Sequence, residues 1–405
     1  MNSLKTIKIK KCRLCNHPRL KKIYNFGDFY VSNFVNFANI KKGIKAPLSL
    51  VYCVNCKLLQ LEHSAPQELM YRKFYWYRSG VTKTMRDSLY ELYTDIKKKC
   101  KLKKKDLILD IGANDGTFLN YFKKDGIVTV GCEPAKNLQK DLNKNCNIVI
   151  NDFWSKESYE KIFKSKSILK PKVITAIGMF YDLEDPSKFI KDAADILHDD
   201  GIFVAQLMCL HSMLEENDLG NICHEHLEFY SYSSLKYLFE KNGLKIFRIT
   251  KNNVNGGSYR IYCKKNIKKS VSYKEKTSLK DVQNFIKRIK KNKDTFLNFF
   301  KMCLKKEKKV FLYGASTKGN TLLQYYKLNS SHIKYAAERS PEKWGKYTIG
   351  TGIKIISENE ARQLNPDYFF VMPYAFIDEF IKREKKWIKK GGEFILPYPK
   401  FKLVK

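Results

Sequence analysis

Residues 107–117, Leu-Ile-Leu-Asp-Ile-Gly-Ala-Asn-Asp-Gly-Thr, form the first stretch whose residue types and spacing could do chemistry. The apolar start predicts a buried parallel strand, and Gly112 and Gly116 predict a tight loop before a helix near Thr117. Glycine lets such a loop lie close to a ligand. The spacing fits neither a dinucleotide fingerprint nor a phosphate loop. Asp110 at the strand end would instead favour a cationic or amine-bearing ligand.

Acidic or polar residues also follow the next predicted strands. The strand at 127–131 leads to Glu133, about 20 residues beyond the glycine loop, where a carboxylate can accept hydrogen bonds from both ribose hydroxyls. Asn151 and Asp152 follow a strand at 147–150, from which an adenine edge can be read. Because open α/β sheets bind ligands at the carboxyl ends of their strands, this pattern predicts a nucleoside site.

A second reactive group is the run His224-Glu225-His226. A His-x-His pair could bind a metal, but the run lacks the helix-spaced partner of an H-E-x-x-H motif. A histidine beside a glutamate is better suited to act as a general base with an electrostatic partner. The alternative is that these polar residues only cap the helix that begins after Ser231.

Four of the eleven cysteines form two Cys-x-x-Cys pairs, Cys12 with Cys15 and Cys53 with Cys56. Each pair places two thiolates on one side of a turn, and two such turns complete a tetrahedral zinc site. In a cytosolic chain of this size the pairs are more often metal ligands than disulfides. Protein would fill all four coordination positions, so the predicted zinc is structural. The alternative is four reduced thiols in a core.

Three further segments have ligand-binding residue types. Residues 75–80 place hydrogen-bonding aromatics beside a Ser-Gly turn, as a ligand wall or as a packing cluster. Residues 252–260 contain a Gly-Gly turn between two strands, which could cradle a phosphate or sugar or be a plain hairpin. A strand at 310–313 leads through a second glycine loop to a helix. Lys318 in that loop suits an anion at the helix N-terminus, unless it is merely solvated.

Composition narrows the class of protein. The chain is 43% apolar, has no run long enough to span a membrane and begins without the apolar core of a signal peptide, so we expect a cytoplasmic protein. The net charge of +36 suggests a nucleic-acid partner, but only 11 of the 77 basic residues are arginines and the 66 lysines are spread along the chain. Nucleic-acid recognition favours clustered arginines, so we expect no such partner. An anionic substrate would still be attracted.

The 405 residues are enough for several domains. Apolar residues from Val282 to Phe300 recur at helical spacing, so a helix there is expected to pack. Further strands are expected at 173–177, 202–206, 333–337, 368–372 and 393–396. We predict a zinc-binding domain at 1–85, a nucleoside-binding α/β domain at 86–265, a linker and helix at 266–304, and a small doubly wound domain at 305–405.

Together these motifs resemble those of the nucleotide-sugar C-methyltransferases of deoxysugar pathways, which use S-adenosylmethionine (SAM). The glycine loop resembles the first motif of class I SAM methyltransferases. The resemblance covers nearly the whole chain and implies an α/β fold: a class I SAM methyltransferase sheet flanked by a four-cysteine zinc-binding domain and a C-terminal Rossmann-like domain. The matching segments are Cys12/Cys15/Cys53/Cys56, Tyr75-x-Tyr77-x-Ser79-Gly80, Asp110–Gly116, His224–His226, Gly256-Gly257-Ser258-x-Arg260 and Tyr313–Asn320.

The resemblance implies that His226 is the base and Glu225 its neighbour. With the residue patterns above, it gives four sets of site residues. They are His226, Glu225, Tyr75, Tyr77 and His224 for catalysis; Asp110, Gly112, Asn114, Gly116, Glu133, Asn151 and Asp152 for SAM; Ser79, Cys223, Tyr181, Gly257, Ser258, Arg260, Tyr313, Lys318 and Asn320 for the substrate; and Cys12, Cys15, Cys53 and Cys56 for zinc.

The sequence departs from the family pattern at two positions. Members of the family often have a tyrosine where this chain has Cys223, and they often have a histidine in the segment that corresponds to residues 179–182, which contains none here. We expect SAM-dependent C-methylation of a nucleotide-linked keto sugar through an enolate, in surface-polysaccharide or deoxysugar biosynthesis. The cofactors would be SAM and one structural zinc ion, with no membrane partner. The alternatives are an O- or N-methyltransferase on a nucleotide sugar or glycan, and a basic RNA-binding methyltransferase. The oligomeric state, the sugar, the nucleotide and the methylated position stay open.

Overall fold

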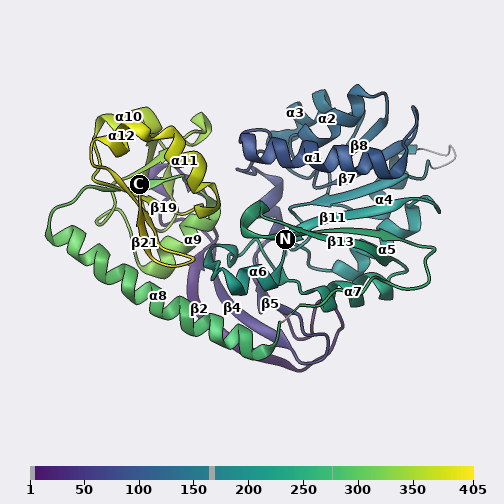
Figure 1. Ribbon diagram of the computed structural model, residues 1–405, viewed down its shortest axis with the longest axis horizontal. Helices are drawn as coiled ribbons and strands as arrows, with labels where there is room; N and C mark the ends of the chain where they lie inside the picture. The colour runs from purple at the N-terminus through teal and green to yellow at the C-terminus, as the bar shows by residue number, and fades with distance from the viewer. Residues whose placement is uncertain (1–4, 164–168, 276) are drawn as a thin grey trace.

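The computed structural model describes residues 5–163, 169–275 and 277–405. Figure 1 shows two α/β lobes, one from the middle of the chain and one from its C-terminal part. A small antiparallel sheet lies at their lower edge, and the long helix α8 (Leu279–Lys305) runs along the base of the molecule. The three parts of the chain therefore meet at the centre of the molecule.

The N-terminal segment forms most of a four-stranded antiparallel sheet in the order β12-β5-β4-β2. Its edge strand β12 belongs to the middle of the chain and begins two residues after His226. This pairing ties the predicted base to the N-terminal sheet. The strands are β2 (Leu20–Tyr30), β4 (Lys45–Cys53), β5 (Leu59–Leu61) and β12 (Glu228–Phe229), with a separate pair β1 (Ile7–Lys8) and β6 (His63–Ser64) and a π-helix η2 (Glu68–Arg72).

The middle lobe contains a seven-stranded sheet in the order β13-β14-β11-β10-β7-β8-β9. The last five strands in this order run parallel, and the first two are antiparallel at one edge. All five residues of β7 are buried, as expected for a parallel strand covered on both faces. The predicted strands are confirmed to within two residues: β7 (Leu107–Ile111), β8 (Val128–Cys132), β9 (Ile148–Ile150), β10 (Val173–Ile177) and β11 (Ile202–Met208), with β13 (Lys245–Asn252) and β14 (Ser258–Lys264) completing the sheet.

The C-terminal lobe contains an eight-stranded sheet in the order β21-β20-β19-β15-β16-β18-β17-β3. The four predicted strands form its parallel centre together with β18, which the sequence analysis missed. The outermost strand, β3 (Phe34–Val35), comes from the N-terminal segment. The other strands are β15 (Val310–Tyr313), β16 (Tyr335–Glu338), β17 (Tyr347–Thr348), β18 (Lys354–Ser357), β19 (Tyr368–Val371), β20 (Glu393–Leu396) and β21 (Lys402–Val404).

Helix α8 packs as its apolar periodicity predicted. Its buried face, which includes Phe285 and Phe296, joins a hydrophobic core shared with the N-terminal sheet and the C-terminal lobe. The three parts thus share one core, and each lobe also has a hydrophobic cluster of its own. The remaining helices are α1 (Lys83–Cys100), α2 (Thr117–Lys124), α3 (Gln139–Asn145), α4 (Lys156–Glu160), α5 (Pro186–Ile196), α6 (Leu210–Glu215), α7 (Tyr232–Lys241), α9 (Thr317–Tyr326), α10 (Glu358–Gln363), α11 (Ile377–Arg383) and α12 (Lys385–Lys389).

Candidate active site

A cavity of about 470 Å³ lies where the N-terminal segment and the two lobes meet. In the middle lobe its wall is formed at the carboxyl ends of β7, β8, β10 and β11, the usual ligand side of a parallel sheet. Residues 67–79 of the N-terminal segment form a second wall, and residues 316–318 and 372–376 of the C-terminal lobe form a third. A ligand in this cavity would therefore contact all three parts.

Two buried carboxyl groups mark the end of the cavity next to β7 and β8. The Oδ1 atom of Asp110 accepts a hydrogen bond from Thr175 Oγ1 at 2.6 Å, and burial raises the pKa of Asp110 to about 7. Glu133 accepts hydrogen bonds from the backbone N–H of Asn114 at 3.0 Å and of Ala135 at 2.9 Å, and burial raises its pKa. These acceptors fit SAM, which offers a cationic amino group and two ribose hydroxyls.

Gly112 and Asn114 also line this end of the cavity. Gly112 has a φ of +75°, and a Cβ atom there would lie 2.6 Å from Met179 Cγ. The glycine is therefore needed both for the left-handed turn and for the close approach of the opposite wall.

Three other predicted cofactor residues lie outside the cavity wall. A Cβ atom on Gly116 would lie 2.7 Å from Asn145 Cβ, so this glycine allows α3 to pack against the loop. The Asn151 side chain donates to the Glu133 carbonyl oxygen at 3.0 Å and braces that residue. Asp152 accepts a hydrogen bond at 2.6 Å from an arginine of the N-terminal segment. These three residues therefore lie behind the cavity wall and hold neighbouring residues in position.

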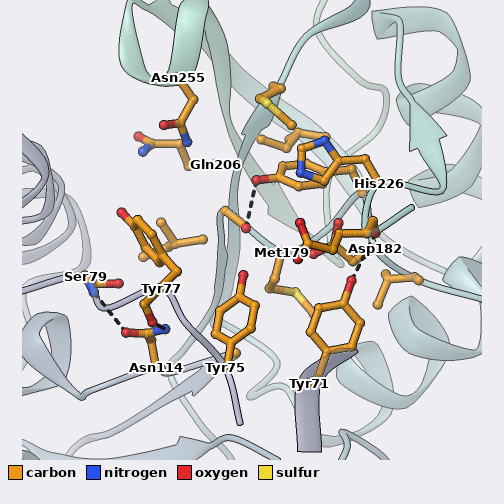
Figure 2. Close-up of a pocket in the computed structure, with 18 of the residues that line it drawn as sticks. Tyr71, Tyr75, Tyr77, Ser79, Asn114, Met179, Asp182, Gln206, His226 and Asn255 are labelled. Carbon is orange, nitrogen blue, oxygen red and sulfur yellow. Dashed lines mark hydrogen bonds between the residues drawn. The ribbon is translucent and has the colours of Figure 1, made fainter. Parts of the chain in front are cut away.

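The predicted aromatic segment forms one side of the cavity. Figure 2 shows Tyr71, Tyr75 and Tyr77 along this side, with Ser79 held beside Asn114. The Asn114 side chain accepts from the Ser79 N–H at 2.9 Å and donates to the Tyr77 carbonyl at 3.1 Å. The glycine loop of the middle lobe thus positions the aromatic wall directly.

His226 lines the cavity opposite these tyrosines (Figure 2). Its Nδ1 atom lies 2.7 Å from the Asn221 carbonyl oxygen, which can only accept, so Nδ1 carries the proton and Nε2 has a free lone pair. Burial, followed by the charge of Lys318, lowers the pKa of His226 well below its usual value. The Tyr181 ring packs against the imidazole at a centroid distance of 4.6 Å. A neutral imidazole in a fixed tautomer is the form a general base needs.

Glu225 and Lys318 extend this centre toward the C-terminal lobe. The Glu225 carboxylate accepts from Thr317 Oγ1 at 2.9 Å, and burial raises its pKa. Lys318 Nζ donates to Asn221 Oδ1 at 3.0 Å. Asn221 therefore contacts Lys318 with its side chain and His226 with its backbone. The lysine sits beside the predicted base.

His224 and Cys223 do not line the cavity. Residues 223–226 form a turn closed by a hydrogen bond from the His226 N–H to the Cys223 carbonyl, and the turn directs the two histidines apart. His224 Nε2 lies 2.9 Å from the Ala46 carbonyl oxygen in the N-terminal sheet. Cys223 is buried, with its thiol 3.8 Å from a Glu225 carboxylate oxygen. The structure thus places His224 away from the cavity wall, against the N-terminal sheet.

The other predicted substrate residues fall into two groups, those that line the cavity and those that do not. Ser79, Tyr181, Ser258 and Lys318 line the cavity, whereas Gly257, Arg260, Tyr313 and Asn320 do not. Gly257 lets the hairpin pack on Ser212 of α6, and Arg260 is tied to Gln206 and Glu91. The Tyr313 hydroxyl donates to Glu384 at 2.6 Å, and the Asn320 amide holds the Ile349 carbonyl at 3.2 Å. These four residues support the fold around the site.

Sequence reasoning missed several residues of the cavity wall. Tyr71 precedes the aromatic motif and belongs to the π-helix η2, and Asp182 follows Tyr181, which was the one residue of its segment predicted to bind the substrate. The position of Gln206 at the end of a predicted strand was the one usable signal, because strand ends form the ligand edge. The missed wall residues with polar groups include Tyr71, Asp182, Gln206, Asp218, Tyr374 and Tyr398.

The four predicted zinc ligands come together at one end of the N-terminal sheet. The sulfur atoms of Cys12, Cys15, Cys53 and Cys56 all lie within 4.8 Å of one another, with closest pairs at 3.5 and 3.6 Å. Sulfur atoms around a tetrahedral zinc ion, each about 2.3 Å from the metal, have comparable separations. The Gln60 side chain donates to Cys12 Sγ at 3.1 Å, a partner suited to a thiolate. The cluster fits a structural zinc ion.

Three family models match successive parts of the chain. They are described as "Putative zinc binding domain" over residues 12–71, "Methyltransferase domain" over 81–249 and "C-methyltransferase C-terminal domain" over 253–399. Together with the cavity at the ligand edge of a class I sheet, they define the class: the chain is a SAM-dependent methyltransferase with a zinc-binding N-terminal domain. Its cofactors are SAM and zinc.

A particular relative covers nearly the whole length. The chain is 24% identical over 416 residues to the C-methyltransferase NovU of Streptomyces niveus, covering 98% of this chain and 97% of the relative. Solved structures similar to part of the chain include magnesium protoporphyrin IX methyltransferase of Synechocystis PCC 6803 with bound SAM, at 9% identity, 44% of this chain, 78% of that chain and a TM-score of 0.33. A SAM-dependent methyltransferase of Clostridium acetobutylicum matches at 10% identity, 44% of this chain, 91% of that chain and a TM-score of 0.34.

Helices that could cross a membrane are not found among the residues that the structure describes.

Proposed function

We propose that this protein methylates a carbon atom of a nucleotide-linked keto sugar through an enolate, in the biosynthesis of a surface polysaccharide or a deoxysugar. The main support is His226, a buried imidazole on the cavity wall whose tautomer leaves Nε2 free to accept a proton. The C-methyltransferase family model and the similarity to NovU support carbon as the acceptor atom.

A sugar carbon becomes nucleophilic when a proton α to a ketone is removed. His226 Nε2 would take this proton, and the electrons of the C–H bond would pass into the enolate. SAM, when bound, supplies an electrophilic methyl group. Tyr75, Tyr77 and Glu225 would hold the sugar, and the tyrosine hydroxyls would stabilise the negative charge that develops on its oxygen. After the new C–C bond forms, the His226 imidazolium would release its proton to solvent.

We further propose that the nucleotide lies against the C-terminal lobe, so that the sugar projects toward His226. Thr317 and Lys318 reach the cavity from α9, and the aromatic side chains of Tyr374 and Phe376 line the same wall. In this proposal residues 1–85 hold zinc, residues 86–265 hold SAM, residues 266–304 connect, and residues 305–405 hold the nucleotide. Binding energy from this remote handle would orient the reacting carbon.

A thermal-shift screen identifies the substrate class. Nucleoside-diphosphate keto sugars are tested with SAM present, because a ligand that binds the native state raises the melting temperature. Corresponding sugars without the ketone and bulk RNA at two salt concentrations serve as competing candidates. A shift with RNA that collapses at higher salt, with none for keto sugars, would favour the RNA-binding alternative.

The base assignment is tested by proton exchange at carbon. With a keto sugar from the screen in deuterated water and no SAM, the wild-type protein should incorporate deuterium at the carbon α to the ketone. His226→Asn should slow this exchange and methyl transfer by about 100-fold or more while SAM affinity stays the same. His332→Asn, at a partly exposed position that does not line the cavity, is the matched control. Near-normal exchange in His226→Asn would rule out the base.

The methylated atom is read from the product. Nuclear magnetic resonance should place the new methyl group on carbon. A methyl group on oxygen or nitrogen would favour the alternative function, in which the acceptor already carries a lone pair and no enolate is needed.

A further inference from the structure

Asp182 is a buried carboxyl group on the cavity wall with an unsatisfied oxygen atom. The residue is 9% exposed, and its Oδ1 atom has no hydrogen-bond partner within the described part of the chain. Its backbone is fixed at both ends, since its N–H donates to the Met179 carbonyl at 3.0 Å and its carbonyl accepts from Gln67 Nε2 at 3.2 Å. Buried polar atoms are almost always paired, so this oxygen lacks a partner that a ligand could supply.

The position of Asp182 relates it to the reacting centre. Figure 2 shows its side chain beside His226 and above the Tyr71 hydroxyl, on the side of the cavity that faces Tyr75. The carbonyl of the preceding residue accepts hydrogen bonds from Leu227 and Glu228, which links this turn to the chain just after the base. A ligand atom within reach of His226 Nε2 would therefore lie close to Asp182.

The surroundings favour the protonated form of this carboxyl group. Burial, followed by the neighbouring carboxylates of Glu225 and Glu228, raises the pKa of Asp182 well above its usual value. The Lys318 ammonium and the Tyr71 hydroxyl oppose this effect but are the smaller influences. A carboxylic acid kept neutral by its site can donate a hydrogen bond at neutral pH.

We propose that Asp182 binds the ketone oxygen of the substrate as a carboxylic acid and donates a hydrogen bond to the enolate oxygen. This inference rests on the proposed function. When His226 takes the α proton, the C–H electrons form the carbon–carbon double bond and the carbonyl π electrons move to oxygen. The Asp182 proton stays on its carboxyl group and stabilises that oxygen throughout. The carbonyl reforms as the enolate carbon bonds to the methyl group, whose bond to the SAM sulfur breaks with its electron pair left on sulfur. An ionised carboxylate here would repel the enolate.

Two substitutions separate donation from other roles. Asp182→Asn keeps an N–H donor and cannot ionise, so kcat should stay within about tenfold of the wild type. Asp182→Ala removes the donor and should lower kcat by about 100-fold or more, the usual cost of losing one oxyanion donor. SAM affinity should be unchanged in both, and melting temperatures check that both fold. Asp199→Asn, whose side chain is 71% exposed, is the matched control.

Two results would overturn the proposal. If Asp182→Asn loses as much activity as Asp182→Ala, the group acts as a carboxylate, for example toward a cationic amine on the substrate. If neither variant loses activity, Asp182 does not contact the reacting oxygen.

A measurement on the protein without substrate keeps this inference distinct from the proposed function. The infrared difference spectrum between the wild type and Asp182→Asn at pH 7 should contain the C=O stretching band of a protonated carboxylic acid. A carboxylate band instead would overturn the inference even if sugar methylation is confirmed. Failure of every keto sugar to react would contradict the proposed function while leaving this spectral result as evidence for a neutral carboxyl group.

Discussion

The middle lobe and the C-terminal lobe each contain a strand–glycine loop–helix unit, but we expect only the unit of the middle lobe to bind SAM. In the middle lobe, Gly112 donates its N–H to the Cys132 carbonyl at 2.9 Å, and Glu133 accepts from a loop N–H at 3.0 Å. In the C-terminal lobe, Gly314 donates to the Ala337 carbonyl at 2.8 Å, and Glu338 accepts from a loop N–H at 2.9 Å. Both glycines have a left-handed φ, +75° and +88°. The two loops thus start with corresponding hydrogen bonds, although the helix begins five residues after Gly112 and three residues after Gly314.

The side chains differ. Two residues before the glycine stands Asp110 in the first unit and the buried Leu312 in the second. In the second unit Lys343 Nζ also bonds the Ala315 carbonyl at 2.8 Å and the Glu338 carboxylate at 3.3 Å, and it lies over the Phe34 ring. A lysine therefore occupies the region that the first unit leaves open. The loop backbone alone does not make a cofactor site; the neighbouring side chains decide whether the space is free and charged appropriately.

The largest difference between the two units should appear in SAM affinity. Glu133→Gln replaces an oxygen that accepts from a backbone N–H and removes a carboxylate from the cavity, so SAM should bind about 10- to 100-fold more weakly. Glu338→Gln makes the same change in the second unit and should leave SAM affinity within about twofold, because any loss is confined to the C-terminal lobe. Isothermal titration calorimetry measures both. Equal losses would mean that both units take part in SAM binding.

The second unit should act through Lys318 on the reaction instead. Burial and the Lys318 charge together lower the pKa of His226, so Lys318→Ala should raise that pKa. The base would then stay protonated to a higher pH, and the acidic limb of the pH profile of kcat/KM should move upward. Because burial alone still lowers the pKa of His226, the imidazole stays neutral at pH 7 in the variant, and activity there should fall by less than about tenfold, with SAM affinity unchanged. A higher KM for the nucleotide sugar without a shifted profile would assign Lys318 to the diphosphate.

Asp110, the buried acid that the first unit has and the second unit lacks, should also lower the free energy of unfolding near neutral pH. Burial raises the pKa of Asp110 from 3.8 to about 7, so between these values the folded protein holds a proton that the unfolded chain has lost. The contribution of this group to stability therefore falls as the pH rises through that window. Asp110→Asn should reduce the fall in unfolding free energy between pH 4 and pH 7 by about 1 kcal/mol or more. Urea unfolding at the two pH values tests this, and equal falls in both proteins would contradict it.

We expect the smallest effect for Lys343, whose side chain packs against the glycine loop of the second unit. Lys343→Ala removes two hydrogen bonds and a contact with an aromatic ring, so the unfolding free energy should decrease by about 1 kcal/mol. SAM affinity should not change. Lys334→Ala, at an exposed position nearby, should have almost no effect on either quantity. A weaker SAM complex in Lys343→Ala would show that the two units are coupled.

The sequence by itself determined the elements whose signals are local. Short apolar runs followed by glycine or proline predicted β7, β10, β15 and β20, because a strand buried on both faces needs continuous hydrophobic residues. The Cys-x-x-Cys spacing predicted the cysteine cluster, since each pair acts within one turn. Helix α8 followed from a 3.6-residue period. Because these signals are local, the order of the α/β units along the chain could be predicted, and with it the edge of the sheet where ligands bind.

Only the tertiary structure decided which side chains reach the cavity. Strands β3 and β12 join sheets formed by distant parts of the chain, and two-residue strands carry too little pattern to reveal such pairings. His224 and His226 have equal chemistry, and the turn between them sends only His226 into the cavity. Lys318 comes close to His226 through Asn221, and Oδ1 of Asp182 has no hydrogen-bond partner among the described residues, because the lobes pack around a shared core. Proximity between residues separated by long stretches of chain depends on that packing, which no local spacing encodes.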